Sequence, residues 1–158
     1  MSARHRFQPR GQRRLRTGRR SLANQVYHIT TVTYGRKPTF ADLRCGRAVV
    51  EALREVSDSG RCHTLCFVVM PDHLHWLMQM ADNEELAACV RKVKGSSARR
   101  INRLRGGSQR VWQAAFHDHA LRRDEDVIAV ARYIIANPVR ANLVTRVGDY
   151  PLWDAVWL

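Results

Sequence analysis

Two apolar runs joined by a short Pro-Asp connection constrain the fold of this chain more than any other feature. Residues 62–70 (CHTLCFVVM) and 73–80 (HLHWLMQM) both favour strands, and the connection between them predicts an antiparallel hairpin. Alternate side chains of a strand point to opposite faces, so His73 and His75 lie on one face while the residue between them packs inward. A rigid strand therefore presents two imidazoles side by side, as two metal ligands or as one ligand and a base.

The other hydrophobic patterns alternate between strand and helix. Residues 24–34 are rich in β-branched and aromatic side chains and predict a first strand, and residues 111–122 predict a fourth. Residues 40–57 and 84–104 have apolar side chains at helical spacing. Within the second of these helices, Gly95-Ser96-Ser97 predicts either a kink or a close approach of another backbone.

A last helix is predicted after the acidic residues 124–126, which favour a helix N-terminus, and it ends near Asn137 because Pro138 disfavours helical geometry in its predecessor. The resulting order is β-α-β-β-α-β followed by a helix. It predicts an α+β protein with a ferredoxin-like (split βαβ) antiparallel sheet, helices on one face and a C-terminal helix that bears Tyr133. The other face of the sheet is then expected to be free for a ligand.

The chain is strongly basic. It has 27 Lys and Arg against 14 Asp and Glu, a net charge of +13, and the first twenty residues contain many arginines and no acid. This balance is typical of proteins that bind polyanions such as nucleic acids. Residues 1–20 are predicted as a basic tail that is disordered unless bound, and residues 21–158 as a single domain. A solvated face is the alternative for part of the helix charges. The side chains expected to neutralise DNA phosphates are Arg13, Arg14, Arg16, Arg19 and Arg20 in the tail and Arg91, Lys92, Lys94, Arg99, Arg100 and Arg103 on the second helix.

The four cysteines form no CxxC pair and are predicted to be reduced core thiols of a cytoplasmic protein. No apolar stretch reaches the length of a membrane span, so no membrane partner is expected. One alternative is a zinc-stabilised binding protein, in which His117 and His119 would share a metal with Cys62 and Cys66.

Tyr133 and Asn137 are one helical turn apart, on the flank of the apolar stripe of the last helix. Two interpretations of the tyrosine remain open, a boundary aromatic with a hydrogen-bonded hydroxyl or a residue that reaches across to the sheet. Asn137 before proline is also a natural helix terminator. Trp76 and Trp112 are either core residues or aromatics on which unpaired bases stack.

Phrases along most of the chain resemble one branch of the HUH endonucleases. His73-Leu74-His75 fits the His-hydrophobe-His motif of that superfamily, and Tyr133 followed by Asn137 resembles its single-tyrosine transposases. The branch is that of the REP-associated tyrosine transposases, and the similarity covers about residues 18–147. The phrases that carry it are Gly18-Arg-Arg-Ser-Leu, Gln25-Val-Tyr-His-Ile-Thr, Val69-Met-Pro-Asp-His-Leu-His, Val111-Trp-Gln, Asp118-His119-Ala-Leu-Arg and Tyr133-Ile-x-x-Asn-Pro-Val-Arg-Ala-Asn-Leu-Val.

This resemblance implies a metal-dependent endonuclease and strand transferase that acts on single-stranded DNA hairpins from repetitive extragenic palindromes (REP). Tyr133 would attack phosphorus and form a 5′-phosphotyrosine, while His73, His75 and Asn137 would hold one Mg²⁺ or Mn²⁺. Many insertion-sequence relatives carry glutamine at the position of Asn137, and the shorter amide requires a closer approach of the helix. The branch implies a monomer, and His119 is either structural or in contact with DNA. The alternative function is a non-cleaving hairpin DNA- or RNA-binding module of RRM-like fold.

Overall fold

The strands of the computed structural model, which describes residues 24–157, form one antiparallel sheet in the order β4-β1-β3-β2-β5. This order, with one helix between β1 and β2 and another between β3 and β4, is that of a ferredoxin-like fold, so the predicted fold class is confirmed. The basic tail predicted for residues 1–20 lies outside the described residues. The elements are β1 (Val26–Val32), η1 (Tyr34–Arg36), η2 (Thr39–Ala41), α1 (Leu43–Asp58), β2 (Cys62–Met70), β3 (His73–Met80), α2 (Leu86–Arg105), β4 (His117–Ala120), α3 (Val127–Ile135), α4 (Asn137–Arg140), η3 (Val147–Asp149) and β5 (Trp153–Ala155).

The central hairpin has the predicted boundaries. β2 ends at Met70 and β3 begins at His73, and these two residues lie opposite one another in the ladder. β1 pairs with the other edge of β3, so that Val32 lies opposite His73 and Thr30 opposite His75. The strand that carries the two histidines is therefore hydrogen-bonded on both sides, which fixes the directions of its side chains.

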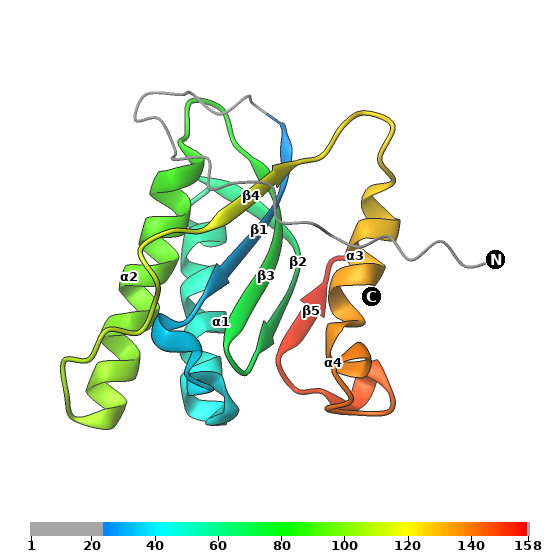
Figure 1. Ribbon diagram of the computed structural model, residues 1–158. Helices are drawn as coiled ribbons and strands as arrows, with labels where there is room; N and C mark the ends of the chain where they lie inside the picture. The colour runs from blue at the N-terminus through cyan, green and yellow to red at the C-terminus, as the bar shows by residue number, and fades with distance from the viewer. Residues whose placement is uncertain (1–23, 158) are drawn as a thin grey trace.

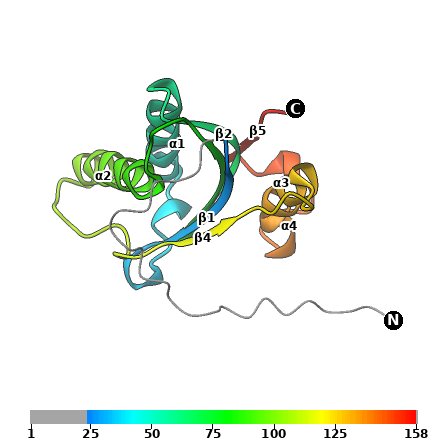
Figure 2. The ribbon, with the colours of Figure 1, turned by 90° about the horizontal axis from the view of Figure 1, so that it is seen from above.

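Helices lie on both faces of the sheet (Figures 1 and 2). α1 and α2 pack side by side on one face, where Val49 and Leu53 of α1 share a buried apolar cluster with Leu74 of β3. α3 packs on the opposite face and buries Ala131 and Ile134. The expectation of an entirely free second face is therefore wrong. Because α3 contacts β2, β3 and β5, it covers one side of that face only.

β4 is shorter than the predicted strand 111–122 because the segment before it turns into the core. Trp112 forms only an isolated bridge with Thr33, and its buried indole Nε1–H donates a 2.9 Å hydrogen bond to Ser97 Oγ. α2 continues through Gly95-Ser96-Ser97 without a break, so the predicted kink is wrong. The small Ser97 side chain instead lets the Trp112 indole pack against the helix.

The positions of Trp76 and Trp112 in the fold decide between the two interpretations of these residues. Trp76 and Trp112 are both buried core residues, which excludes stacking of bases on either of them.

β5 was not predicted, because three residues give no periodic signal, and it pairs with the edge of β2. Within residues 24–157, no helix has both the length and the apolar character needed to cross a membrane.

The alternative zinc site is wrong. A register shift between Thr64 and Cys66 places Cys62 and Cys66 in different core clusters. His117 and His119 lie on β4, which β1 and β3 separate from β2. All four cysteines are buried free thiols.

Candidate active site

The two imidazoles of β3 face one another. His73 Nε2 and His75 Nε2 are 3.2 Å apart, and the ring planes are nearly perpendicular, at 85°. Both rings are partly buried. The i, i+2 spacing on a paired strand produces this arrangement, as the sequence predicted.

Hydrogen bonds at the other ring nitrogens orient both histidines. His73 Nδ1 lies 2.6 Å from Asp72 Oδ1, and since a carboxylate only accepts, this nitrogen carries the proton and leaves Nε2 with its lone pair. His75 Nδ1 lies 3.1 Å from His28 Nε2 and 3.2 Å from Thr30 Oγ1, and either atom can accept its proton. In that tautomer the two Nε2 lone pairs face one another with no hydrogen between them, so a shared cation would remove their repulsion.

The distance between the two Nε2 atoms fits a shared metal ion. Imidazole nitrogens bind metals at about 2.1 Å, and two such bonds with ends 3.2 Å apart enclose an angle of about 100°. That angle lies between the octahedral and tetrahedral values. Among residues 24–157, no group of three or more His, Cys, Asp and Glu side chains is arranged to hold a metal. Within these residues, a third protein ligand would be of another type, such as an amide.

Burial keeps the imidazoles of His75 and His28 neutral near pH 7. Burial lowers the pKa of His75 to about 3, and the neighbouring His28, His73 and Arg140 add to the shift. Burial lowers the pKa of His28 to about 4, with a further contribution from His119. A neutral imidazole is the form that binds metals.

Histidines from two further strands share this face of the sheet. Thr30 lies opposite both His75 on β3 and His117 on β4, and directly opposed residues point to the same face. In the next row, His119 lies opposite His28. The side of the face that α3 leaves open is therefore lined by imidazoles.

His119 has a protein partner. Its Nε2 lies 3.0 and 3.1 Å from the two carboxylate oxygens of Glu125, in the turn that leads into α3. The Glu125 carboxylate also accepts from the backbone N–H of Arg122, and these hydrogen bonds lower its pKa. The contact between His119 and Glu125 thus connects β4 to the turn before α3, the helix that carries Tyr133. This is a structural role for His119.

Tyr133 is on α3 and its side chain is 60% exposed. The guanidinium of Arg140, from α4, lies 3.7 Å from the centre of the tyrosine ring. The positive charge of the same guanidinium makes a small contribution to the lowered pKa of His75. No hydrogen bond joins the Tyr133 hydroxyl to the histidines in the described part of the chain.

The helix that carries Tyr133 ends at Ile135, close to the predicted end near Asn137, and Asn137 begins the separate short helix α4. Its Nδ2 donates a 2.7 Å hydrogen bond to the Ile134 carbonyl, and no donor within residues 24–157 reaches its Oδ1. The Asn137 oxygen is therefore not engaged by a neighbouring side chain. In the part of the chain that the structure describes, no hydrogen bond joins Asn137 to His73 or His75.

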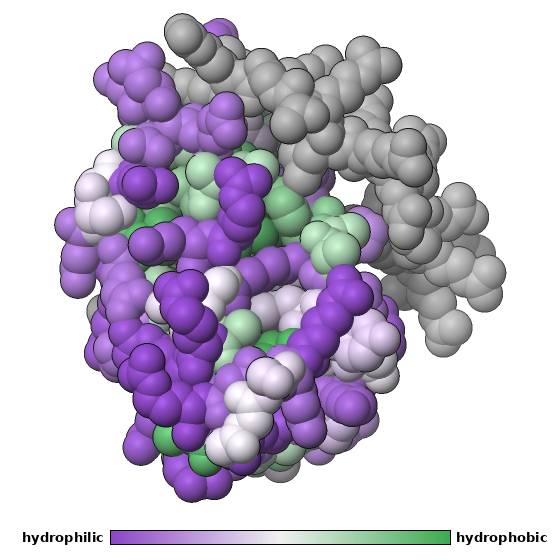
Figure 3. Space-filling view, turned by 90° about the vertical axis from the view of Figure 1, so that its left-hand side faces the viewer, coloured by the Kyte–Doolittle hydropathy of each residue, from purple (hydrophilic) through white to green (hydrophobic). Residues whose placement is uncertain are grey.

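α2, with the predicted basic surface, lies on the opposite face of the sheet from α3 (Figure 2). The histidine pair is on the α3 face, because Leu77, two residues after His75, packs with α3. Hydrophilic residues cover most of the side of the molecule on which α2 lies (Figure 3). Lys94 and Arg100 are engaged, the first by the Gln113 and Ala115 carbonyls and the second by Glu55. The exposed members of the predicted set are Arg91, Lys92, Arg99 and Arg103.

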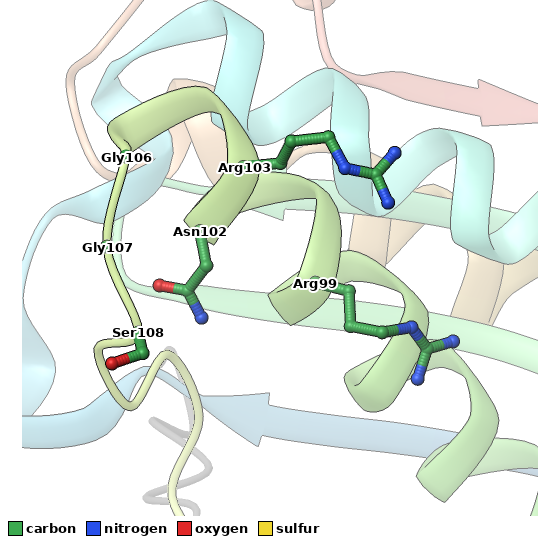
Figure 4. A pocket seen from close by; sticks show the side chains of 6 residues that line it. All are labelled: Arg99, Asn102, Arg103, Gly106, Gly107 and Ser108. Carbon is green, nitrogen blue, oxygen red and sulfur yellow. The ribbon is translucent and has the colours of Figure 1, made fainter.

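Arg99 and Arg103 line a shallow hollow at the C-terminal end of α2 (Figure 4), together with Asn102 and residues 106–108. At this end of α2, which is predicted to bind DNA, two guanidinium groups therefore line the same hollow. Arg13, Arg14, Arg16, Arg19 and Arg20 lie outside the described residues. A DNA contact for any of these side chains stays a prediction.

Three residues that contact the candidate site residues were not assigned a role from the sequence, His28 and Thr30 at His75 and Arg140 at Tyr133. His28 and Thr30 share a strand face by alternation, but only the pairing of β1 with β3 brings them to His75. Arg140 stands in one of the phrases that carry the resemblance, but no role was assigned to it, because its position depends on the turn between α3 and α4.

Comparison with known families identifies the class of protein. The family model described as "Transposase IS200 like" matches residues 21–137. The class is therefore that of transposases. Since the match covers most of the chain, the protein belongs to the IS200-like transposase family.

Two curated relatives agree with the branch that the sequence resembles. A Haemophilus influenzae protein whose name assigns it, provisionally, to the REP-associated tyrosine transposases is 31% identical over 110 residues, or 63% of this chain and 62% of the relative. The REP-associated tyrosine transposase of Escherichia coli K12 is 30% identical over 87 residues, or 54% and 49% of the two chains. The matched part spans about half to three-fifths of these relatives. The resemblance to this branch is confirmed.

Two solved structures have the same fold. One is a REP-associated tyrosine transposase bound to a REP hairpin, with a TM-score of 0.67, 22% identity, and coverage of 85% of this chain and 79% of that chain. The other is a Deinococcus radiodurans protein provisionally named a transposase, with a TM-score of 0.54, 22% identity, and coverage of 78% and 97%. At this identity the likeness concerns the fold.

Proposed function

We propose that this protein is a metal-dependent endonuclease and strand transferase for single-stranded DNA that folds into REP hairpins. Family membership supports a transposase, and the named relatives support the REP hairpin as substrate class. The observation that carries the chemistry is the 3.2 Å separation of His73 Nε2 and His75 Nε2. We place the protein in the cytoplasm, which its four free thiols support.

The proposed metal ligands are His73, His75 and the Asn137 amide oxygen. Two imidazoles and one amide suit Mn²⁺ well and also admit Mg²⁺. The bound ion would polarise the scissile phosphate. Asp72 and Thr30 would hold the two Nδ1 protons, so that both Nε2 atoms keep their lone pairs for the ion.

Tyr133 is the proposed nucleophile. Its hydroxyl would attack phosphorus to give a 5′-phosphotyrosine, and the 3′ oxygen would leave as a free hydroxyl. The phosphodiester energy is retained in the tyrosine link, so the strand can be rejoined without ATP. Arg140 is at hand to hold the ring and to balance the charge of the phosphate.

The test is the formation of a covalent adduct. A labelled single-stranded REP-type hairpin is incubated with the protein and Mn²⁺, and the protein is then separated under denaturing conditions. The proposal requires label on the wild type and on Tyr27→Phe, a control at a core tyrosine, and none on Tyr133→Phe. Tyr133→Phe should still bind the hairpin. A wild type that binds the hairpin and never forms the adduct would instead be the non-cleaving binding module.

A further inference from the structure

Tyr34 is an exposed aromatic residue held in a fixed position. Its side chain is 46% exposed, and the guanidinium of Arg110 lies over its ring, 4.8 Å from the ring centre. The Tyr34 N–H donates to the Val111 carbonyl at 2.8 Å, and Arg110 Nε donates to the Trp112 carbonyl at 3.2 Å. The backbone therefore fixes both members of the stack while the ring stays in solvent.

This stack lies at the end of the sheet where β3 begins with His73. Tyr34 follows β1, where Val32 lies opposite His73. The Thr33 N–H donates to the Asp72 carbonyl at 2.9 Å, and the Asp72 carboxylate orients His73. The stack thus lies just beyond the end of β1, on the β1 side of His73. Tyr133 lies on the other side, on α3, which covers β2.

The charges around the stack suit a phosphate backbone. Arg36, Lys37 and Arg110 are all exposed. The acidic partner within reach is Asp72, 3.6 Å from Arg36. In the described part of the chain, the Tyr34 hydroxyl has no hydrogen-bond partner, so the ring is not needed to satisfy a buried group.

We infer that Tyr34 and Arg110 form a platform on which an unpaired base of single-stranded DNA stacks beside the histidine pair. Aromatic rings and guanidinium planes both stack on bases, and exposed cations hold the flanking phosphates. The strand would then run from this platform across His73 and His75 towards Tyr133. The inference rests on the proposed function, because it assumes a single-stranded DNA substrate at this site.

The test measures binding without metal, so that it does not depend on cleavage. Two labelled probes are compared, a blunt DNA hairpin and the same hairpin with a single-stranded extension at its foot. Tyr34→Ala should weaken binding of the extended hairpin by about tenfold, as expected for one lost base stack, and leave the blunt hairpin within twofold of wild type. Tyr34→Phe, which keeps the ring, should bind the extended hairpin as the wild type does.

Two controls separate stacking from general effects. Arg47→Ala removes an exposed charge from α1 on the far side of the sheet and should not alter the preference for the extension. A 5-iodouracil placed at successive positions of the extension should photocrosslink to Tyr34 at one or two positions. Equal losses for both probes, or an unchanged affinity of Tyr34→Ala for the extended hairpin, would overturn the inference. A missing Tyr133 adduct would count against the proposed function alone.

Discussion

The guanidinium of Arg140 lies 3.7 Å from the centre of the Tyr133 ring, and its Nη1 donates a 2.7 Å hydrogen bond to the Tyr133 carbonyl oxygen. The contact spans the junction of α3 and α4 and holds an exposed ring in one orientation. The same positive charge reaches His75. Arg140 therefore fixes the Tyr133 ring at the junction of α3 and α4, and its charge also acts on His75.

We expect Arg140→Met to slow formation of the Tyr133 adduct by about 10- to 100-fold, because it removes a charge directed at the phosphate and loosens the nucleophile. Arg140→Lys should recover part of the rate. The measurement is the single-turnover rate of adduct formation with saturating hairpin. Arg132→Met removes an exposed charge from α3, next to Tyr133 in the sequence, and should stay within threefold of wild type. A wild-type rate for Arg140→Met would exclude this role.

Asp72→Ala should weaken Mn²⁺ binding by about 10- to 100-fold, because His73 loses the acceptor that fixes its tautomer. Titration calorimetry with Mn²⁺ alone measures this without DNA. The matched control is Arg36→Ala, which removes the ion pair to Asp72 and keeps the carboxylate beside His73. Similar losses in both variants would mean that the ion pair, and not the hydrogen bond to His73, supports the metal site.

The metal-free protein should lose stability as the pH falls below about 6.5. The folded-state pKa values of His28 and His75 are about 4 and about 3, so between these values and 6.5 the unfolded chain binds protons that the folded chain does not. His28 alone accounts for roughly 2 kcal/mol between pH 7 and pH 4.5. Urea unfolding at both pH values should therefore show a smaller pH dependence for His28→Gln than for wild type. An equal dependence in the two proteins would contradict the burial argument.

The elements with a clear hydrophobic period could be predicted from the sequence, and those set by tertiary contacts could not. β2 and β3 have the predicted limits because each is a continuous apolar run next to a Pro-Asp turn. The apolar run at Val111-Trp112 has the same local pattern as a strand. Its burial against Ser97, which no local pattern specifies, takes it out of the sheet.

The residues of the candidate site also divide into those placed by local strand geometry and those placed by tertiary contacts. His73 and His75 are brought together by local strand geometry, and spacing alone predicts it. His28 reaches His75 only because β1 pairs with β3 in one register, and a shift by one residue would turn His28 to the other face. Arg140 depends on the bend between two helices where the sequence indicated a single helix end.

Ser97→Ala should lower the free energy of unfolding by about 1–2 kcal/mol, because the buried Trp112 N–H would lose its acceptor. Trp112→Phe removes the same donor and also the bulk of the indole. The two effects should therefore not add in the double variant, and the coupling is measured by urea unfolding of the four proteins. Full additivity would mean that the hydrogen bond contributes nothing.

The tyrosine and the histidines of one chain should act together, in a monomer. Ala131 and Ile134 of α3 are buried in one apolar cluster with Val68 of β2 and Leu77 of β3 of the same chain, so α3 packs on its own sheet. A mixture of Tyr133→Phe with the double variant His73→Ala/His75→Ala should therefore form no adduct, since neither chain has a complete site. If α3 were exchanged between two copies, the mixture would combine an intact tyrosine with an intact histidine pair and recover a fraction of wild-type adduct. Labelled hairpin on a denaturing gel, together with the molar mass in solution at the same concentration, distinguishes the two arrangements.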